Sequence, residues 1–236
     1  HLNPDGTIGR IAAGVYHKGL GSVAERTFRP HVSCTRLTPD RKFIMVADLG
    51  VDQVKIYKFT GDQMVLVDTI PCDLESAPRH FIFSADGKFI YLMYEVKNVI
   101  DVYTYETGKR APKIEKIQTI PTAAGKTAVQ LTAACAIRFS SDERHLFCSN
   151  AGEDTVNVFK RDPETGLLES ICCLPISGSY PKDIAVFPDD RHLASFNHES
   201  GTITFFHIDY EKGLLVMCGR PMKLDEPNCC AIVKVR

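Results

Sequence analysis

The sequence contains no tryptophan, no run of like charges and no apolar stretch close to the roughly 20 residues that span a bilayer. Its formal net charge of −1 supplies no broad basic field of the kind that nucleic acids and anionic membranes attract. The first residues also lack the charged, apolar and small-residue order of a signal peptide. We therefore expect neither a nucleic acid nor a membrane as a partner.

Patterns for metal binding and disulfides are missing too. The nine cysteines are an odd number that lie mostly in apolar segments, and they include the adjacent pairs Cys172–Cys173 and Cys229–Cys230. No CxxC or HxxxH pair occurs, and neither a Gly-x-Ser-x-Gly motif nor a Gly-rich nucleotide loop is present. We expect reduced cysteines in the core, which favours a cytoplasmic protein, and no metal or cofactor.

What the sequence does contain is a fourfold internal repeat. Each repeat has a turn aspartate after a short apolar strand, at Asp40, Asp86, Asp142 and Asp189. These aspartates lie 46, 56 and 47 residues apart, and an insertion around Thr122–Thr132 accounts for the long interval. A period of about 40 to 50 residues is typical of β-propellers.

Within each repeat the pattern predicts four strands. An apolar strand such as Phe81–Phe83 leads into the aspartate turn, and a nearly continuous apolar run such as Phe89–Met93 follows, as in a strand covered on both faces. An alternating strand such as Val156–Phe159 and a Gly-containing hairpin then lead to an outer strand. No helical periodicity is sustained. We predict an all-β fold, a β-propeller of four complete antiparallel blades in one domain over residues 1–236.

The two ends of the chain match parts of further blades. Asn3–Ile8 resembles the hairpin between the third and fourth strands of a repeat, and Pro227–Val233 resembles a first strand. Together they would make a blade without its two middle strands, so we expect a partial ring rather than a closed five-bladed one. Because open sheet edges and apolar faces favour association, we expect the missing blades to lie on a longer native chain and these residues alone not to form a self-sufficient monomer.

Several motifs carry a family resemblance over most of the chain, from about Asn3 to Val235. They are the RPH sequence at Arg29–His31, the APRH sequence at Ala77–His80, the TPD and SADG turns and the YEVKN segment. Their order resembles the lactonase family of seven-bladed β-propellers, which includes 6-phosphogluconolactonases and carboxy-muconate lactonizing enzymes. The resemblance implies seven blades in the intact fold and a small anionic lactone or sugar metabolite as the ligand.

Two positions of the repeat are candidates for a functional site. They are the start of the first strand and the residue after the second strand, which in a propeller meet at one end of the central channel. Both positions are polar in some repeats and apolar in others, whereas a purely structural position should look alike in all. The first holds Ser33, Arg79, Cys135 and Lys182, and the second holds Leu49, Glu95, Ala151 and His198.

The resemblance implies a catalytic site of His31, Arg79 and Glu95. A histidine and a glutamate would move the protons of lactone hydrolysis, and the arginine would bind a carboxylate or phosphate through its two-pronged donor face. Lys182 would be a weaker anchor in place of a second family arginine, and His198 is a further candidate for substrate binding.

Each of these residues also has a structural interpretation. His31 would hydrogen-bond the backbone at a strand start, Arg79 would bridge two blades through carbonyl groups, and Glu95 would be a solvated turn residue. His80 and His198 fit such structural roles better than functional ones. The chain also departs from the family pattern, with Ala151 where an arginine is frequent and Ser33 where a second histidine is frequent.

Two functions remain open on these grounds. The first is a lactone hydrolase that acts on a sugar lactone or carboxy-lactone and resembles 6-phosphogluconolactonase. The second is a non-catalytic propeller that binds a small metabolite or a protein partner, because one fold can host unrelated activities.

Overall fold

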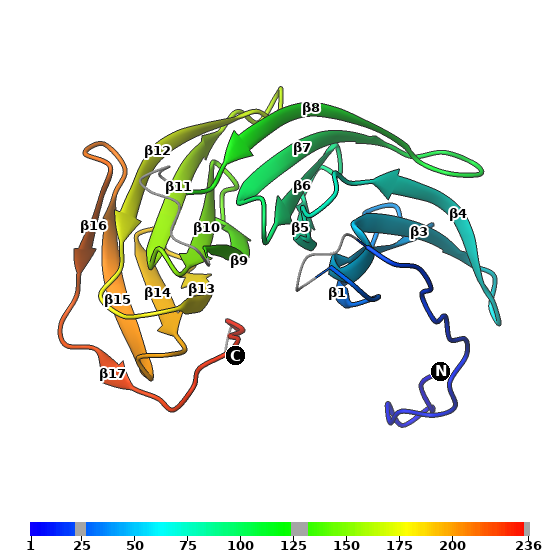
Figure 1. The fold of residues 1–236 in the computed structure, drawn as a ribbon, viewed down its shortest axis with the longest axis horizontal. Coiled ribbons are helices and arrows are strands. Elements are labelled where there is room, and N and C mark those ends of the chain that lie inside the picture. Colours follow the sequence, from blue (N-terminus) through cyan, green and yellow to red (C-terminus); the bar gives the residue numbers. More distant parts are fainter. Residues whose placement is uncertain (22–26, 124–131, 234–236) are drawn as a thin grey trace.

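The computed structural model describes residues 1–21, 27–123 and 132–233. They form four antiparallel sheets of consecutive strands, arranged side by side as the blades of an open arc (Figure 1). Blade 1 consists of β1 (Val32–Leu37), β2 (Ile44–Asp48), β3 (Gln53–Phe59) and β4 (Met64–Pro71). Blade 2 consists of β5 (Pro78–Phe83), β6 (Phe89–Tyr94), β7 (Val99–Glu106) and β8 (Lys113–Pro121).

The other two blades repeat this order. Blade 3 consists of β9 (Ala133–Phe139), β10 (His145–Ala151), β11 (Thr155–Arg161) and β12 (Leu168–Pro175). Blade 4 consists of β13 (Pro181–Val186), β14 (His192–Asn197), β15 (Thr202–Asp209) and β16 (Leu214–Met217), and the short β17 (Met222–Lys223) also pairs with β15. The first strand of every blade lies on the concave side of the arc and the fourth on the outside (Figure 1). The predicted propeller architecture is confirmed.

Helical structure in the described residues is limited to one 3-10 turn, η1 (Leu49–Val51). Within those residues, no helix has both the length and the apolar character needed to cross a membrane.

The turn between the first two strands of each blade is built around the predicted aspartate. In the first three blades a hydroxyl two residues before the aspartate donates to its carboxylate, from Thr38, Ser84 and Ser140. In blade 4 the equivalent residue is Phe187, and Asp189 instead contacts the ring of His192 through Nδ1 at 2.6 Å. All four aspartates therefore lie where the repeat places them.

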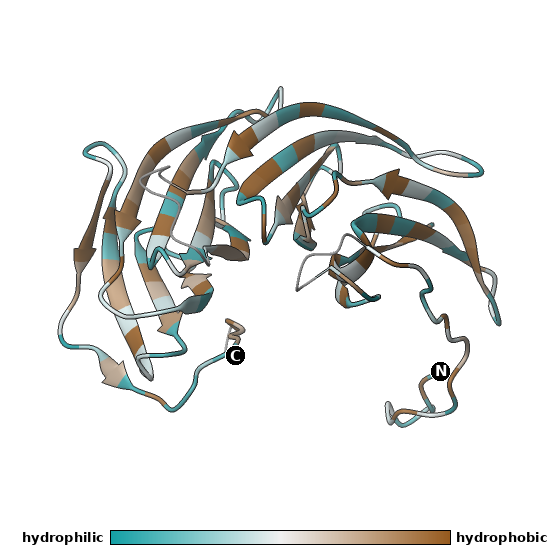
Figure 2. Ribbon diagram, viewed as in Figure 1, coloured by the Kyte–Doolittle hydropathy of each residue, from teal (hydrophilic) through white to brown (hydrophobic). Residues whose placement is uncertain are grey.

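The core lies between adjacent blades. Alternate side chains of β6 enter two separate apolar clusters: Ile90, Leu92 and Tyr94 face blade 1, whereas Phe89, Tyr91 and Met93 face blade 3. A third cluster joins blades 3 and 4 and is built around Phe147. This arrangement explains why the second strands read as continuous apolar runs. Apolar residues are concentrated in the strands, and many of the connecting turns are hydrophilic (Figure 2).

The two ends of the chain differ in how well they match the sequence predictions. The expected hairpin at Asn3–Ile8 is present as a tight turn, closed by a bridge between Leu2 and Ile8. The prediction of a strand at Pro227–Val233 is wrong, because these residues form no strand. A first strand pairs with the second strand of its own blade, and the described residues offer no such partner after β17. The segment instead contacts blade 4 through Cys230, whose backbone N–H donates to Asp183 at 3.0 Å.

The sequence also predicted an insertion around Thr122–Thr132. Residues 124–131 of this insertion lie outside the described residues.

Candidate functional site

A cavity of about 480 Å³ lies where β1 and β5 begin, at one end of the concave face. It contains His31, Arg79 and Glu95 in its wall, together with Phe28, Arg29, Val32, Ser33, Leu49 and His80. The structure thus brings the three residues of the expected catalytic site together, although they come from two blades and lie far apart in the sequence.

His31 is fixed by hydrogen bonds of its own backbone. Its N–H donates to Asp48 Oδ1 at 2.7 Å, and its carbonyl accepts from Leu49 N at 2.9 Å. The preceding loop packs directly on Gly50, where an added Cβ would lie 1.6 Å from the Arg29 carbonyl oxygen. Only glycine leaves room for this approach. The expected backbone contact of His31 is therefore present, and its exposed side chain also borders the cavity.

The start of β5 is held by the neighbouring blade. Asp52 Oδ1 accepts the Ala77 N–H at 2.8 Å, and the second carboxylate oxygen accepts from Glu75 N at 3.0 Å. The Ala77 carbonyl in turn accepts from Glu95 N at 2.8 Å, because β6 runs antiparallel to β5 and ends where β5 begins. This geometry places Glu95 beside Arg79.

Arg79 and Glu95 form an ion pair through Nη1 and Oε2. The Arg79 Nε also donates to the Cys135 carbonyl of blade 3 at 3.0 Å, so the arginine bridges two blades and lines the cavity as well. Burial alone would lower its pKa, but the electrostatic influence of Cys135 and Glu95 outweighs burial and raises it. Glu95 is 5% exposed and is not the solvated turn residue of the structural interpretation.

A second histidine, His80, lies in the same wall. Burial, reinforced by the positive charges of Arg79, Arg138 and Arg36, lowers the pKa of His80 to about 4, so its imidazole is neutral at neutral pH. Its Nδ1 is buried and has no hydrogen-bond partner among the described residues.

Ser33 also lies in this wall, at the position where a second histidine is frequent in the family. Its hydroxyl donates to the Pro78 carbonyl at 2.9 Å and so links β1 to β5.

Lys182 and His198 do not line this cavity. The Lys182 ammonium lies 5.9 Å from the centre of the Tyr180 ring. His198 borders a different cavity of about 500 Å³ next to Asp225 and Glu226.

Ala151 lies in a small apolar cluster with Ala133 and Cys135, against which Tyr180 packs. In blade 3, the equivalent positions Cys135 and Ala151 therefore build packing rather than a polar site.

A buried polar cluster behind His31 does not follow from the repeat. Both ring nitrogens of His17 form hydrogen bonds: Nδ1 lies 2.5 Å from Asp48 Oδ2, and Nε2 lies 3.0 Å from the Tyr57 hydroxyl. The same Asp48 holds the backbone of His31. Only one sequence signal was available: the position of Asp48 holds Tyr94, Asn150 and Asn197 in the other repeats. His17 lies outside the repeats and has no equivalent in them.

No group of three or more His, Cys, Asp or Glu residues is placed to hold a metal ion in the described part of the chain. The polar side chains of the cavity are the Arg79–Glu95 ion pair, the two histidines, Arg29 and Ser33.

Comparisons with known proteins agree with this architecture. A family model described as a lactonase, 7-bladed beta-propeller, matches residues 1–232. An uncharacterized protein of Staphylococcus saprophyticus is 30% identical over 234 residues, which cover 98% of this chain and 66% of that protein.

Solved structures give the same result. The periplasmic gluconolactonase PpgL of Pseudomonas aeruginosa superposes with a TM-score of 0.90 at 26% identity, covering 100% of this chain and 65% of that one. A Bacteroides fragilis protein provisionally described as a 6-phosphogluconolactonase superposes with a TM-score of 0.85 at 28% identity, covering 97% and 65% of the two chains. The present chain spans about two thirds of the length of these relatives.

Proposed function

The chain belongs to the lactonase family of seven-bladed β-propellers, and from that premise we propose that it takes part in the hydrolysis of a sugar lactone or carboxy-lactone. The observation that carries the proposal is the shared cavity of His31, Arg79 and Glu95. Two structural relatives carry names of 6-phosphogluconolactonase or gluconolactonase type, which makes sugar lactones the first substrates to test.

The proposed reaction opens the ring with one water molecule. The water oxygen attacks the acyl carbon, and one of its protons passes to the Glu95 carboxylate. The bond between the acyl carbon and the ring oxygen then breaks, while the His31 imidazolium donates a proton to that oxygen. The product is the hydroxy acid, and the proton taken up by Glu95 passes through solvent to His31, which restores both groups for the next turnover. Each proton transfer of this kind contributes roughly 10²- to 10⁴-fold to the rate.

Arg79 supplies positive charge next to the reacting group. Its pKa is raised by Cys135 and Glu95 against the effect of burial, so the guanidinium stays charged while it binds an anionic substituent or the developing oxyanion. Two of its donors hold Cys135 and Glu95, which fix the plane of the guanidinium. Such preorganised donors act without reorganisation during the reaction.

The same contacts favour the alternative of a non-catalytic metabolite-binding propeller. Arg79 and Glu95 compensate each other's charge, and Arg79 also joins blades 2 and 3. In this alternative the pair is a structural link, and the cavity binds a small anionic metabolite without turning it over. We also propose that the whole protein is cytoplasmic and that it needs neither a metal nor a cofactor.

A hydrolysis screen of the native-length protein tests the proposal. The substrates are 6-phosphogluconolactone, gluconolactone and a carboxy-lactone, and Glu95→Gln should lower kcat by about 10²-fold or more because it removes a proton acceptor. Glu115→Gln, which changes an exposed glutamate on the outer strand β8, is the matched control and should leave kcat unchanged. A wild-type protein that binds lactones without hydrolysing any of them would establish the binding alternative.

A further inference from the structure

A second, larger cavity occupies the concave face beyond the His31–Arg79–Glu95 cavity. It measures about 870 Å³ and is lined by the later residues of the four first strands, β1, β5, β9 and β13, and by residues 230–232. Its size is within the range of small-molecule sites, which is about 300 to 1,000 Å³. We call it the channel cavity.

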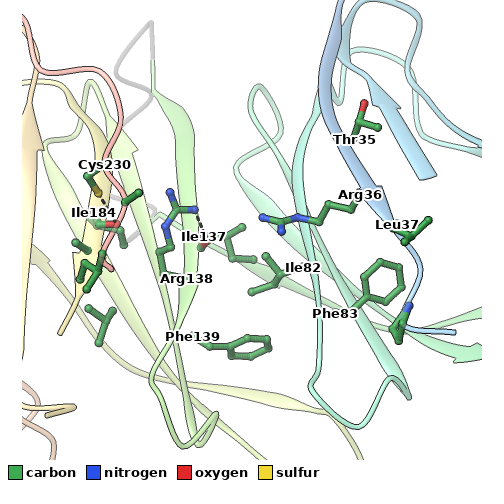
Figure 3. Close-up of a pocket in the computed structure, with 15 residues that line it drawn as sticks. Thr35, Arg36, Leu37, Ile82, Phe83, Ile137, Arg138, Phe139, Ile184 and Cys230 are labelled. Carbon is green, nitrogen blue, oxygen red and sulfur yellow. Dashed lines mark hydrogen bonds between the residues drawn. The ribbon is translucent and has the colours of Figure 1, made fainter. Parts of the chain in front are cut away.

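The channel cavity has two arginines in its wall, and they differ in their partners. Arg138 on β9 is compensated, because its Nη2 bonds both carboxylate oxygens of Asp183 at 2.7 and 2.8 Å. The side chain of Arg36 on β1 makes no ion pair or hydrogen bond to any residue that the structure describes, and it is exposed. Figure 3 shows its side chain extending from β1 into the cavity, toward β9.

Several apolar side chains lie around Arg36 in the channel cavity. Ile82, Ile137 and Phe139 line the cavity from β5 and β9, opposite Arg36 on β1 (Figure 3). Asp183, the acid held by Arg138, also accepts the Cys230 N–H and so has little capacity for a second guanidinium. A cation in a concave site with apolar walls concentrates its field and attracts anions.

An independent observation supports the positive field. The buried His80, one residue after Arg79 on β5, has its pKa lowered by burial and then by Arg79, Arg138 and Arg36. Three guanidinium groups therefore act on the inner strands at this point, and only those of Arg79 and Arg138 have a carboxylate partner in the described residues.

We propose that Arg36 binds the phosphate or carboxylate group of a small sugar acid in the channel cavity. The guanidinium presents two parallel donors that match the oxygens of either anion. The carbon skeleton of the ligand lies against Ile82 and Ile137. The identification of the ligand as a sugar acid rests on the proposed function, whereas anion binding at Arg36 does not.

Direct titration calorimetry on the native-length protein tests this site without turnover. The probes are 6-phosphogluconate, gluconate, inorganic phosphate and uncharged glucose, and the variant is Arg36→Gln. Loss of a charge-assisted contact should weaken anion binding by roughly tenfold to a hundredfold, and binding should weaken further with added salt. Arg110→Gln, which removes the same charge from an exposed hairpin on the outside of blade 2, is the matched control.

The outcomes separate the ligand sources and the two proposals. Weaker binding of 6-phosphogluconate alone in Arg36→Gln supports a phosphate site, and an equal loss for gluconate supports a carboxylate site. The site is overturned if no anion binds, if Arg36→Gln binds like the wild type, or if only Arg79→Ala weakens binding. If Arg36→Gln weakens binding but the wild type hydrolyses no lactone, the proposed function fails and the anion site stands. Equal thermal unfolding of the variants excludes loss of folding as the cause.

Discussion

At the scale of single residues, Arg79 joins structure and proposed function, and its two contacts make its replacement informative. Arg79→Ala should raise KM for anionic lactones by roughly tenfold to a hundredfold, because it removes a charge-assisted contact to the substituent. Neutral lactones should be affected much less. Steady-state kinetics on gluconolactone and its 6-phosphate would measure the difference. Equal losses for both substrates would mean that Arg79 does not bind the anionic substituent, and would leave it the developing oxyanion or the link between blades 2 and 3 through the Cys135 carbonyl.

His17 gives a stability prediction that is independent of catalysis. Its ring joins Asp48, which is fully buried, to the Tyr57 hydroxyl. His17→Ala leaves one oxygen of the buried carboxylate without this donor, which should lower the free energy of unfolding by about 1–3 kcal/mol. Urea denaturation measures the change, and His207→Ala, at an exposed position of β15, is the control. An equal effect of the two variants would show that the cluster contributes nothing specific.

The family resemblance singled out His31, Arg79 and Glu95, and the repeat predicted them as neighbours because it fixes the position of a residue along the channel. It could not show that Lys182 lies elsewhere, since equivalent residues of successive blades share that position but are rotated around the channel. Lys182 lies two blades from Arg79 in the order of the sheets. His17 could not be found at all, because its contact with Asp48 joins a segment without repeat pattern to blade 1.

At the scale of elements, the turn aspartates connect local structure to pH. Burial alone would raise the pKa values of Asp40, Asp86 and Asp142, but hydrogen bonds from hydroxyl and backbone donors outweigh burial and lower them. At Asp189 the backbone N–H of Arg191 and the ring of His192 have the same effect. A carboxyl group with a lowered pKa in the folded state stabilises the protein above its ordinary pKa, and this contribution disappears as pH falls through the lowered value.

Stability should therefore decrease as pH falls below about 4, the ordinary pKa of aspartate. Asp86→Asn removes one of these titrations, so the stability of this variant should depend less on pH in that range than the stability of the wild type. Urea denaturation at a series of pH values measures the slope. Asp62→Asn, at an exposed hairpin position, is the control and should keep the wild-type slope. An unchanged slope in Asp86→Asn would mean that the turns do not contribute to acid unfolding.

The strands themselves were predictable because the alternation of apolar residues and the turn chemistry agree in all four repeats. The exception is Pro227–Val233, which has the composition of a first strand but no second strand to pair with among the described residues. A strand forms only when its backbone groups find a partner. Local pattern therefore predicts which segments can become strands, and the neighbouring element decides whether they do.

At the scale of the whole molecule, stability is shared between neighbouring blades rather than held in one core. Each of the three large clusters contains residues of two adjacent blades, and β2 and β14 share none of these clusters. In such a repeat architecture each unit contacts only its neighbours, so a defect should act mainly on the interface that it touches. The sequence showed the continuous apolar strands that make this possible, but not which residue faces which neighbour.

Phe147 tests this arrangement, because it is fully buried in the cluster between blades 3 and 4. Phe147→Ala should lower the free energy of unfolding by about 3–5 kcal/mol through lost burial and a cavity. Hydrogen exchange measured by mass spectrometry should show faster exchange first in β10 and β14, which contribute Phe147 and Leu193 to that cluster. Exchange in β2, two interfaces away, should change much less. Phe59→Ala, at a half-exposed position of β3, controls for loss of a phenyl ring, and equal acceleration in β2 and β14 would show that the four blades open as a single unit.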